Sequence, residues 1–254
     1  MSKPLLGLFT WYCRRYLRRH FHSIRLSQSV PVPRADGLPL VLFANHASWW
    51  DALVCLVLKD ELYSGRRAFA PIDAAALEKY RFFRRLGFFG VEQGARRGAA
   101  QFLRMANGVL SQPNGLLVLT PQGRFADVRE RPLRFAPGLG HLAARGGATV
   151  FAPLAIEYVY WEERLPEVLI RFGEPVTVRP GEGAGQSAAS WTRRFEGALE
   201  SAQDALGEEA RARQPGAFVS LLRGGAGQGG VYDAWRRLRA AARGETFRPE
   251  HGVL

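Results

Sequence analysis

The sequence predicts an α/β protein with a mostly parallel central sheet flanked by helices, an N-terminal basic amphipathic helix and C-terminal helices. Short apolar runs typical of buried strands alternate with helical patterns through most of the chain, and strands joined through helices form parallel sheets. The chain has 254 residues, of which 47% are hydrophobic and 23% charged. It can therefore bury a large core, and a wholly disordered or collagen-like protein is excluded.

Residues 1–30 are expected to form a basic amphipathic helix that lies on a membrane. Residues 1–35 hold seven basic residues and no acidic one. The apolar stretch Pro4–Cys13 is about half the ~20 residues that a membrane span requires, so we expect peripheral binding to membrane lipids on the cytoplasmic side. The apolar face of this helix is expected to hold Leu5, Phe9, Tyr12, Tyr16, Leu17, Phe21 and Ile24. A helix packed on the protein's own core is the alternative, whereas nucleic acid is not an expected partner because no nucleic-acid-binding motif accompanies the charge.

Residues 31–180 are expected to form one α/β core. Its predicted strands are Leu38–Ala44, Ala68–Ile72, Phe88–Glu92, Leu116–Thr120, Val150–Tyr158 and Val168–Phe172. Its predicted helices are Ala52–Leu58, Ala74–Leu86, Ala99–Leu110 and Leu139–Arg145. A glycine-rich hinge then begins a C-terminal helical extension, residues 181–254, with helices expected at Ser190–Arg213 and Tyr232–Arg243. The only two cysteines, Cys13 and Cys55, cannot form a disulfide framework, which fits a reducing compartment.

The residues that carry chemistry follow the first strand of this core, in the segment Asn45-His46-Ala47-Ser48-Trp49-Trp50-Asp51. In an open α/β sheet, such strand ends border the ligand crevice. On one continuous helix His46 and Asp51 would point about 140° apart, so they can pair only if the chain turns between them. We expect Ser48 to cap a helix whose first turn contains Asp51. From the spacing alone, a merely structural turn with a capping acid remains an alternative.

Paired in this way, His46 and Asp51 are suited to general-base catalysis. The carboxylate would fix the tautomer of the imidazole and stabilise the imidazolium, while the other ring nitrogen takes a proton. The sequence contains no G-x-S-x-G nucleophile elbow, so we expect direct transfer without a covalent enzyme intermediate. No metal site is expected, because aspartate and histidine are too sparse near His46 to form a ligand set.

Four segments in this order, over about residues 38–175, resemble the glycerolipid or lysophospholipid acyltransferases, related to 1-acylglycerol-3-phosphate acyltransferase. The first segment is the N-H-x4-D block that contains His46 and Asp51. The second is Leu86–Gln93, in which Gln93 stands where the family usually has an arginine. The third is Leu119–Phe125, in which Pro121 and Gly123 match the family, Gln122 replaces a glutamate and the arginine is displaced to Arg124. The fourth is Phe151–Leu154, with Pro153 the matching residue.

The resemblance implies transfer of a fatty acyl group from acyl-CoA or acyl carrier protein, as co-substrate, to a lipid hydroxyl. It implies no other cofactor, and it makes His46 the base and Asp51 the residue that orients it. The residues it implies in substrate binding are Asn45, Gln93, Pro121, Gln122, Gly123, Arg124 and Pro153. The glutamines at 93 and 122 make a less acidic acceptor than lysophosphatidate credible, such as a glycolipid, an ornithine lipid or a carotenoid glycoside. A thioester or ester hydrolase on the same site and a non-catalytic anionic-lipid-binding protein are the alternatives.

Aromatic residues near these blocks are candidates for an acyl-chain tunnel, although simple core packing would explain them as well. Trp49 and Trp50 are adjacent, and adjacent side chains diverge on a helix. We therefore expect at least one tryptophan near the mouth of the substrate site. The other candidates are Phe82, Phe83, Phe88 and Phe89.

Overall fold

The computed structural model describes residues 2–92, 94–179 and 181–227, together with 235, 238–240 and 242–243. Its strands are β1 (Ser23–Ser27), β2 (Leu40–Ala44), β3 (Arg67–Asp73), β4 (Phe88–Val91), β5 (Gly115–Leu119), β6 (Thr149–Val159), β7 (Glu167–Phe172), β8 (Val176–Val178) and β9 (Phe218–Arg223). Its α-helices are α1 (Lys3–His20), α2 (Asp51–Leu62), α3 (Ala74–Lys79), α4 (Phe83–Leu86), α5 (Arg96–Leu110), α6 (Gly138–Arg145) and α7 (Ala188–Ala212). Two short 3-10 turns are η1 (Gly183–Gly185) and η2 (Pro215–Ala217).

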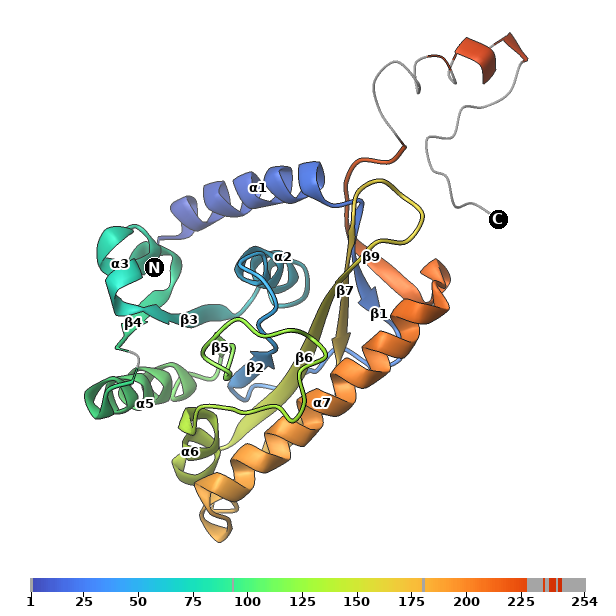
Figure 1. Cartoon of the computed structure of the whole chain (residues 1–254). Helices are drawn as coiled ribbons and strands as arrows, with labels where there is room; N and C mark the ends of the chain where they lie inside the picture. The colour runs from blue at the N-terminus through green and yellow to red at the C-terminus, as the bar shows by residue number, and fades with distance from the viewer. Residues whose placement is uncertain are drawn as a thin grey trace.

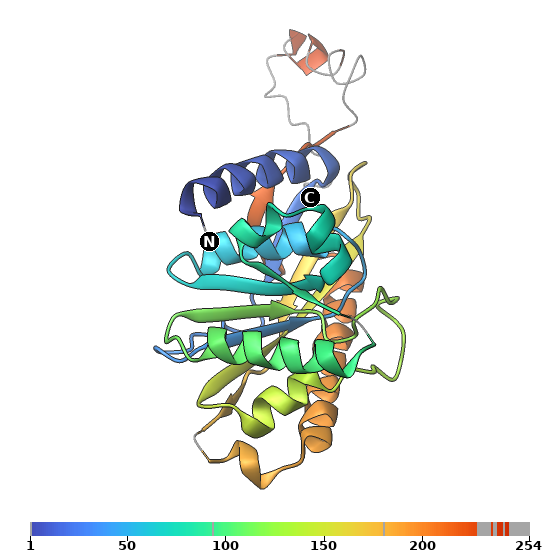
Figure 2. The same cartoon turned by 90° about the vertical axis from the view of Figure 1, so that its left-hand side faces the viewer.

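The strands of the described chain form one sheet in the order β4-β3-β5-β2-β6-β7-β1-β9, with β8 paired to β6 beside this path. The pairs β4–β3, β3–β5, β5–β2, β2–β6 and β7–β1 are parallel, whereas β6–β7, β6–β8 and β1–β9 are antiparallel. Helices cover both faces of the sheet (Figures 1 and 2). The predicted α/β class with a mostly parallel sheet is confirmed.

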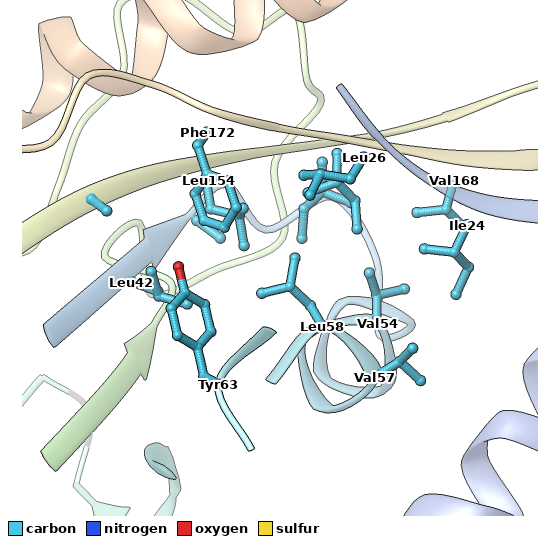
Figure 3. Close-up of a cluster of buried hydrophobic side chains, with 14 of the residues drawn as sticks. Ile24, Leu26, Leu42, Val54, Val57, Leu58, Tyr63, Leu154, Val168 and Phe172 are labelled. Carbon is cyan, nitrogen blue, oxygen red and sulfur yellow. The ribbon is translucent and has the colours of Figure 1, made fainter. Parts of the chain in front are cut away.

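Alternating residues of the buried strands point to opposite faces of the sheet, where they join separate hydrophobic clusters. On one face, Leu40 and Leu42 of β2 pack with Val54 and Leu58 of α2, in the cluster that Figure 3 shows in close-up. On the other face, Phe43 packs with residues of α5, α6 and α7. Strands buried on both faces explain why the sequence shows continuous apolar runs here.

The predicted elements of the core appear within four residues at either end, with one exception. The helix expected over Ala74–Leu86 is broken into α3 and α4, because Tyr80 leaves the helical conformation with φ −120° and ψ 65°. The second piece ends at Gly87, which has φ +110°, a left-handed conformation that glycine adopts without strain. The expected helix Tyr232–Arg243 lies largely outside the described residues.

The sheet extends beyond the expected core of residues 31–180. The helix expected over residues 1–30 ends at His20, and Ile24 lies in β1 rather than on the apolar face of that helix. The expected helical extension likewise contributes a strand, β9, which pairs with β1. The short segment Ser23–Ser27 becomes a strand because β7 and β9 supply its backbone hydrogen-bond partners. Both partners are distant in the sequence.

Helix α1 crosses the molecule above α2 (Figure 1). It buries Cys13 and Leu17 against the core, and Arg14 reaches Asp60 of α2 at 2.9 Å. Leu8, Trp11 and Tyr12 are exposed on its outer side. Of the predicted apolar face, Leu17 therefore packs on the core, whereas Tyr12 does not. No helix among the described residues is long and apolar enough to span a bilayer.

Candidate active site

The His46 segment forms a tight turn between β2 and α2. The amide of Asp51 donates to the Ser48 carbonyl at 3.1 Å, and the Asp51 carboxylate accepts from the amide of Ser48 at 3.0 Å. The Ser48 hydroxyl oxygen accepts from the amide of Trp50 at 3.4 Å. The helix cap itself is Trp50, two residues later than the expected cap at Ser48, because Ser48 organises the turn that precedes the helix.

This turn brings the predicted pair together. Nδ1 of His46 lies 2.8 Å from Oδ2 of Asp51. Since a carboxylate can only accept, Nδ1 carries the hydrogen and Nε2 keeps its lone pair. The Asp51 side chain is 2% exposed, whereas 24% of the His46 side chain is exposed. The charge is therefore held away from water while the imidazole remains reachable, as a general base requires.

A third residue of the site, Tyr158, was not predicted from the sequence. Its hydroxyl donates to Oδ1 of Asp51 at 2.5 Å, so Asp51 binds Tyr158 with one oxygen and His46 with the other. Burial, and then the neighbouring Asp51 carboxylate, raise the pKa of Tyr158 above its ordinary value, which keeps the phenol protonated. Tyr158 lies near the end of β6, the strand beside β2, and this position is the only signal that could have indicated it.

The loop after β5 fixes the backbone of His46 from both sides. The amide of His46 donates to Oε1 of Gln122 at 3.1 Å, and the carbonyl of His46 accepts from the amide of Ala126 at 2.9 Å. The ring of Phe125 lies with its centroid 4.4 Å from that of His46. Gln122, expected to bind substrate, thus positions the histidine in this structure.

The other candidates in this loop differ in their exposure. Gly123 is exposed and has φ +67°, a left-handed conformation that favours glycine. Pro121 is buried, and its carbonyl accepts from the amide of Ala136 at 2.8 Å. The Arg124 guanidinium is about half exposed and forms an ion pair with Glu130. Of these three residues, Gly123 and Arg124 are accessible to a ligand.

Two predicted substrate residues are instead part of the framework. Asn45 is buried, and its side-chain amide donates to the Ile156 carbonyl at 2.9 Å and accepts from the Ile156 amide at 2.8 Å. Pro153 is buried within β6, in register with Phe43 of β2. Both residues lie where β2 meets β6, and the Asn45 side chain holds the two strands together. Gln93 lies outside the described residues.

The expected divergence of the two tryptophans is wrong. Trp49 and Trp50 stack with their ring centroids 4.2 Å apart, because they lie in the turn before α2 rather than on a regular helix. Trp50 also contacts Phe21, whereas Trp49 is 54% exposed and lies beside Tyr16 of α1. Phe82 and Phe83 pack against Phe9 of α1, so these two candidates lie beside α1.

Among the described residues, no group of three or more histidine, cysteine, aspartate or glutamate side chains could hold a metal ion.

Comparison with known proteins identifies the family and supports the fold. A family model described as Acyltransferase matches residues 23–157, just over half of the chain. This match starts at β1 and ends beside Tyr158. Among solved structures, the 1-acyl-sn-glycerophosphate (LPA) acyltransferase PlsC from Thermotoga maritima is similar with a TM-score of 0.55 and 16% sequence identity, over 82% of this chain and 80% of that chain. No curated protein matches the chain.

Proposed function

This chain belongs to the acyltransferase family, and from this premise we propose that it transfers a fatty acyl group from acyl-CoA or acyl carrier protein to a hydroxyl of a lysophospholipid or another lipid. The observation that carries the proposal is the geometry of His46 and Asp51. A buried carboxylate orients a partly exposed imidazole at 2.8 Å. No other histidine of the described chain forms an ion pair with a carboxylate.

The proposed reaction needs only one base. Nε2 of His46 takes the proton of the acceptor hydroxyl while the hydroxyl oxygen attacks the thioester carbonyl. The tetrahedral intermediate then collapses, the carbon–sulfur bond breaks, and the departing thiolate takes the proton back from the imidazolium. Asp51 stabilises the transient positive charge on the imidazole, which is why its burial beside His46 matters.

The acceptor is proposed as a lipid alcohol, with lysophosphatidate as one candidate and a less acidic lipid as the other. Gln122 is neutral and binds the His46 backbone, and Arg124 pairs with Glu130. Nearby Arg129 pairs with Asp127 at 2.8 Å. These pairings favour an acceptor with little charge, such as a glycolipid, an ornithine lipid or a carotenoid glycoside, over a phosphate monoester.

A labelled acyl-CoA incubated with the purified protein and a total lipid extract tests the reaction. We expect an esterified lipid that mass spectrometry identifies, and His46→Ala is expected to lower turnover by about 10² to 10⁴. His22→Ala is the matched control, because His22 binds the Gly225 carbonyl outside the site. Unchanged turnover in a folded His46→Ala protein would refute the role of His46.

The same experiment separates the alternatives. Release of free fatty acid alone would indicate a hydrolase, in which water takes the place of the lipid alcohol. Absence of both products with either donor would favour a non-catalytic lipid-binding protein. The pairing of a buried Asp51 carboxylate with a partly exposed His46 imidazole is the observation that favours catalysis over binding alone.

The membrane is proposed as the place of this reaction, with the protein bound peripherally on the cytoplasmic side. Support comes from α1, which turns Leu8, Trp11 and Tyr12 outwards and carries exposed arginines at positions 15, 18 and 19. Apolar and basic groups side by side are typical of helices that lie in the interface of a bilayer.

A further inference from the structure

The segment Lys79–Arg85 carries an unusual combination of exposed aromatic and basic side chains. Tyr80 and Phe82 are 46% and 42% exposed. The basic residues of the segment are also exposed, and they are Lys79, Arg81, Arg84 and Arg85. Within the described residues none of the four forms an ion pair, and the one acidic neighbour in α3 is the exposed Glu78. Nothing in the proposed reaction uses these side chains.

This segment is joined to α1. The amide of Ser2 donates to the Arg85 carbonyl at 2.9 Å. The ring of Phe9 lies 6.0 Å from that of Phe82 and 6.3 Å from that of Phe83, edge-on in both cases. Figures 1 and 2 show the N-terminal end of α1 beside α3. Phe9 also stacks with the exposed Tyr12, with ring centroids 6.5 Å apart, so the aromatic surface at Phe82 continues onto α1.

The combined surface lies at the same edge of the sheet as the candidate active site. Strands β2 and β3 both run parallel to β5, so their C-terminal ends share one edge. His46 follows β2, and α3 with the segment Lys79–Arg85 follows β3. The ring of Tyr16 on α1 lies 6.3 Å from that of Trp49, which connects the two regions.

We propose that residues 79–85 and the outer side of α1 form one docking face for an anionic bilayer. The face combines the exposed aromatic and aliphatic groups of these two segments with seven exposed basic residues, namely Arg15, Arg18, Arg19, Lys79, Arg81, Arg84 and Arg85. Such a surface complements lipid headgroups of negative charge, since aromatic rings settle at the headgroup level and arginines bind phosphate. A bilayer bound there meets the protein at the edge where His46 lies.

This inference extends the proposed membrane association and rests on it for the identity of the partner, but not on the acyl transfer. Vesicle co-sedimentation measures it without any turnover. The test variant is Arg81→Gln/Arg84→Gln/Arg85→Gln, and the matched control is Arg104→Gln/Arg145→Gln/Arg193→Gln. The control removes three exposed charges from α5, α6 and α7, which cover the opposite face of the sheet.

With vesicles of phosphatidylcholine and phosphatidylglycerol at 0.1 M salt, we expect the test variant to partition about 100-fold more weakly than the unmodified protein. This estimate counts three basic residues near an anionic leaflet, each of which strengthens binding by about a factor of five. The control is expected to change binding by no more than about threefold, because distant charges are screened over a Debye length of about 10 Å. Trp11→Ser should weaken binding as well, and circular dichroism checks that each variant is folded.

Three results would overturn the proposal. The test and control variants could bind equally, the unmodified protein could bind neutral phosphatidylcholine as well as the anionic vesicles, or it could bind neither. If Arg15→Gln/Arg18→Gln/Arg19→Gln weakens binding while the test variant does not, α1 docks alone and residues 79–85 have no part in it.

Discussion

Asp51 holds three hydrogen bonds on its two carboxylate oxygens, from His46, Ser48 and Tyr158. A carboxylate with 2% exposure needs such donors, because burying an unpaired charge is very costly. The three donors also leave it little freedom to turn. One oxygen faces the histidine because the other is held by the tyrosine.

Removing the Tyr158 hydroxyl should therefore disturb the pairing of His46 with Asp51. In Tyr158→Phe we expect kcat to fall about 10-fold with little change in KM, since a hydrogen bond to a charged group contributes about 1.5–3 kcal/mol. Losing this donor makes the carboxylate more basic, so the imidazolium is better stabilised and the acidic limb of the pH–rate profile moves to higher pH. Steady-state kinetics from pH 5 to 9 measure both effects.

Tyr160→Phe is the matched control, because it deletes the same hydroxyl from a tyrosine that is 68% exposed two residues further along. Identical pH profiles in the two variants would show that Tyr158 does not act through Asp51. Far-UV circular dichroism and thermal unfolding separate a loss of fold from a loss of positioning.

At this scale the sequence predicted what is local. His46 and Asp51 are five residues apart, so turn chemistry was enough to pair them. Tyr158 comes from 107 residues beyond Asp51, and only the pairing of β2 with β6 brings it there. Asn45 and Pro153 were assigned to substrate because the family blocks contain them, whereas their burial between β2 and β6 could not be inferred from those blocks.

At the scale of elements, α6 and α7 meet at a glycine. A Cβ atom at Gly140 would overlap the carbonyl of Ala188 and the hydroxyl of Thr192 in the first turns of α7. Gly140→Ala should therefore lower the free energy of unfolding by about 1–3 kcal/mol, as overpacked sites do, although alanine is the better helix former. Urea unfolding followed by circular dichroism measures the difference.

Gly197→Ala makes the same substitution in α7 at a position where no atom lies within 4 Å of the added carbon. It should raise the free energy of unfolding by up to about 1 kcal/mol through helix propensity. A stabilising effect at both glycines would contradict the close approach of α6 and α7.

The burial of a strand or helix decides whether the sequence predicts it. The central strands are covered on both faces, so their apolar runs stand out. Strand β1 reads Ser-Ile-Arg-Leu-Ser, and its Arg25 pairs with Glu167 of β7. This charged pair lies inside the sheet, and no pattern of single residues reveals it. The break at Tyr80 between α3 and α4 was also missed, because the helical spacing of apolar residues continues across it.

At the scale of the whole molecule, alkaline pH should weaken the fold through a buried thiol. Burial in α1 raises the pKa of Cys13 from 9.0 to about 11. Between these values the unfolded chain has released the proton and the folded chain keeps it, so rising pH favours unfolding. The free energy of unfolding should fall by up to about 1.4 kcal/mol per pH unit from this group.

Urea unfolding at pH 8, 9, 10 and 10.5 checks this expectation against Cys13→Ala, which lacks the thiol. The variant should lose stability less steeply above pH 9, while other groups with a raised pKa, such as the buried Tyr63, contribute equally to both proteins. Parallel slopes would show that the thiol ionises as easily in the folded protein as in the unfolded one.

The position of β1 has a consequence for biosynthesis. This strand is made among the first thirty residues, yet its neighbours are β7, about 144 residues later, and β9, about 196 residues later. During translation it has no ladder partner until β7 has left the ribosome, and its second partner β9 follows later still. Since contacts between distant segments form slowly, we expect β1 to gain its two partners late in folding, and a nascent chain stalled before residue 218 would display an open sheet margin to chaperones.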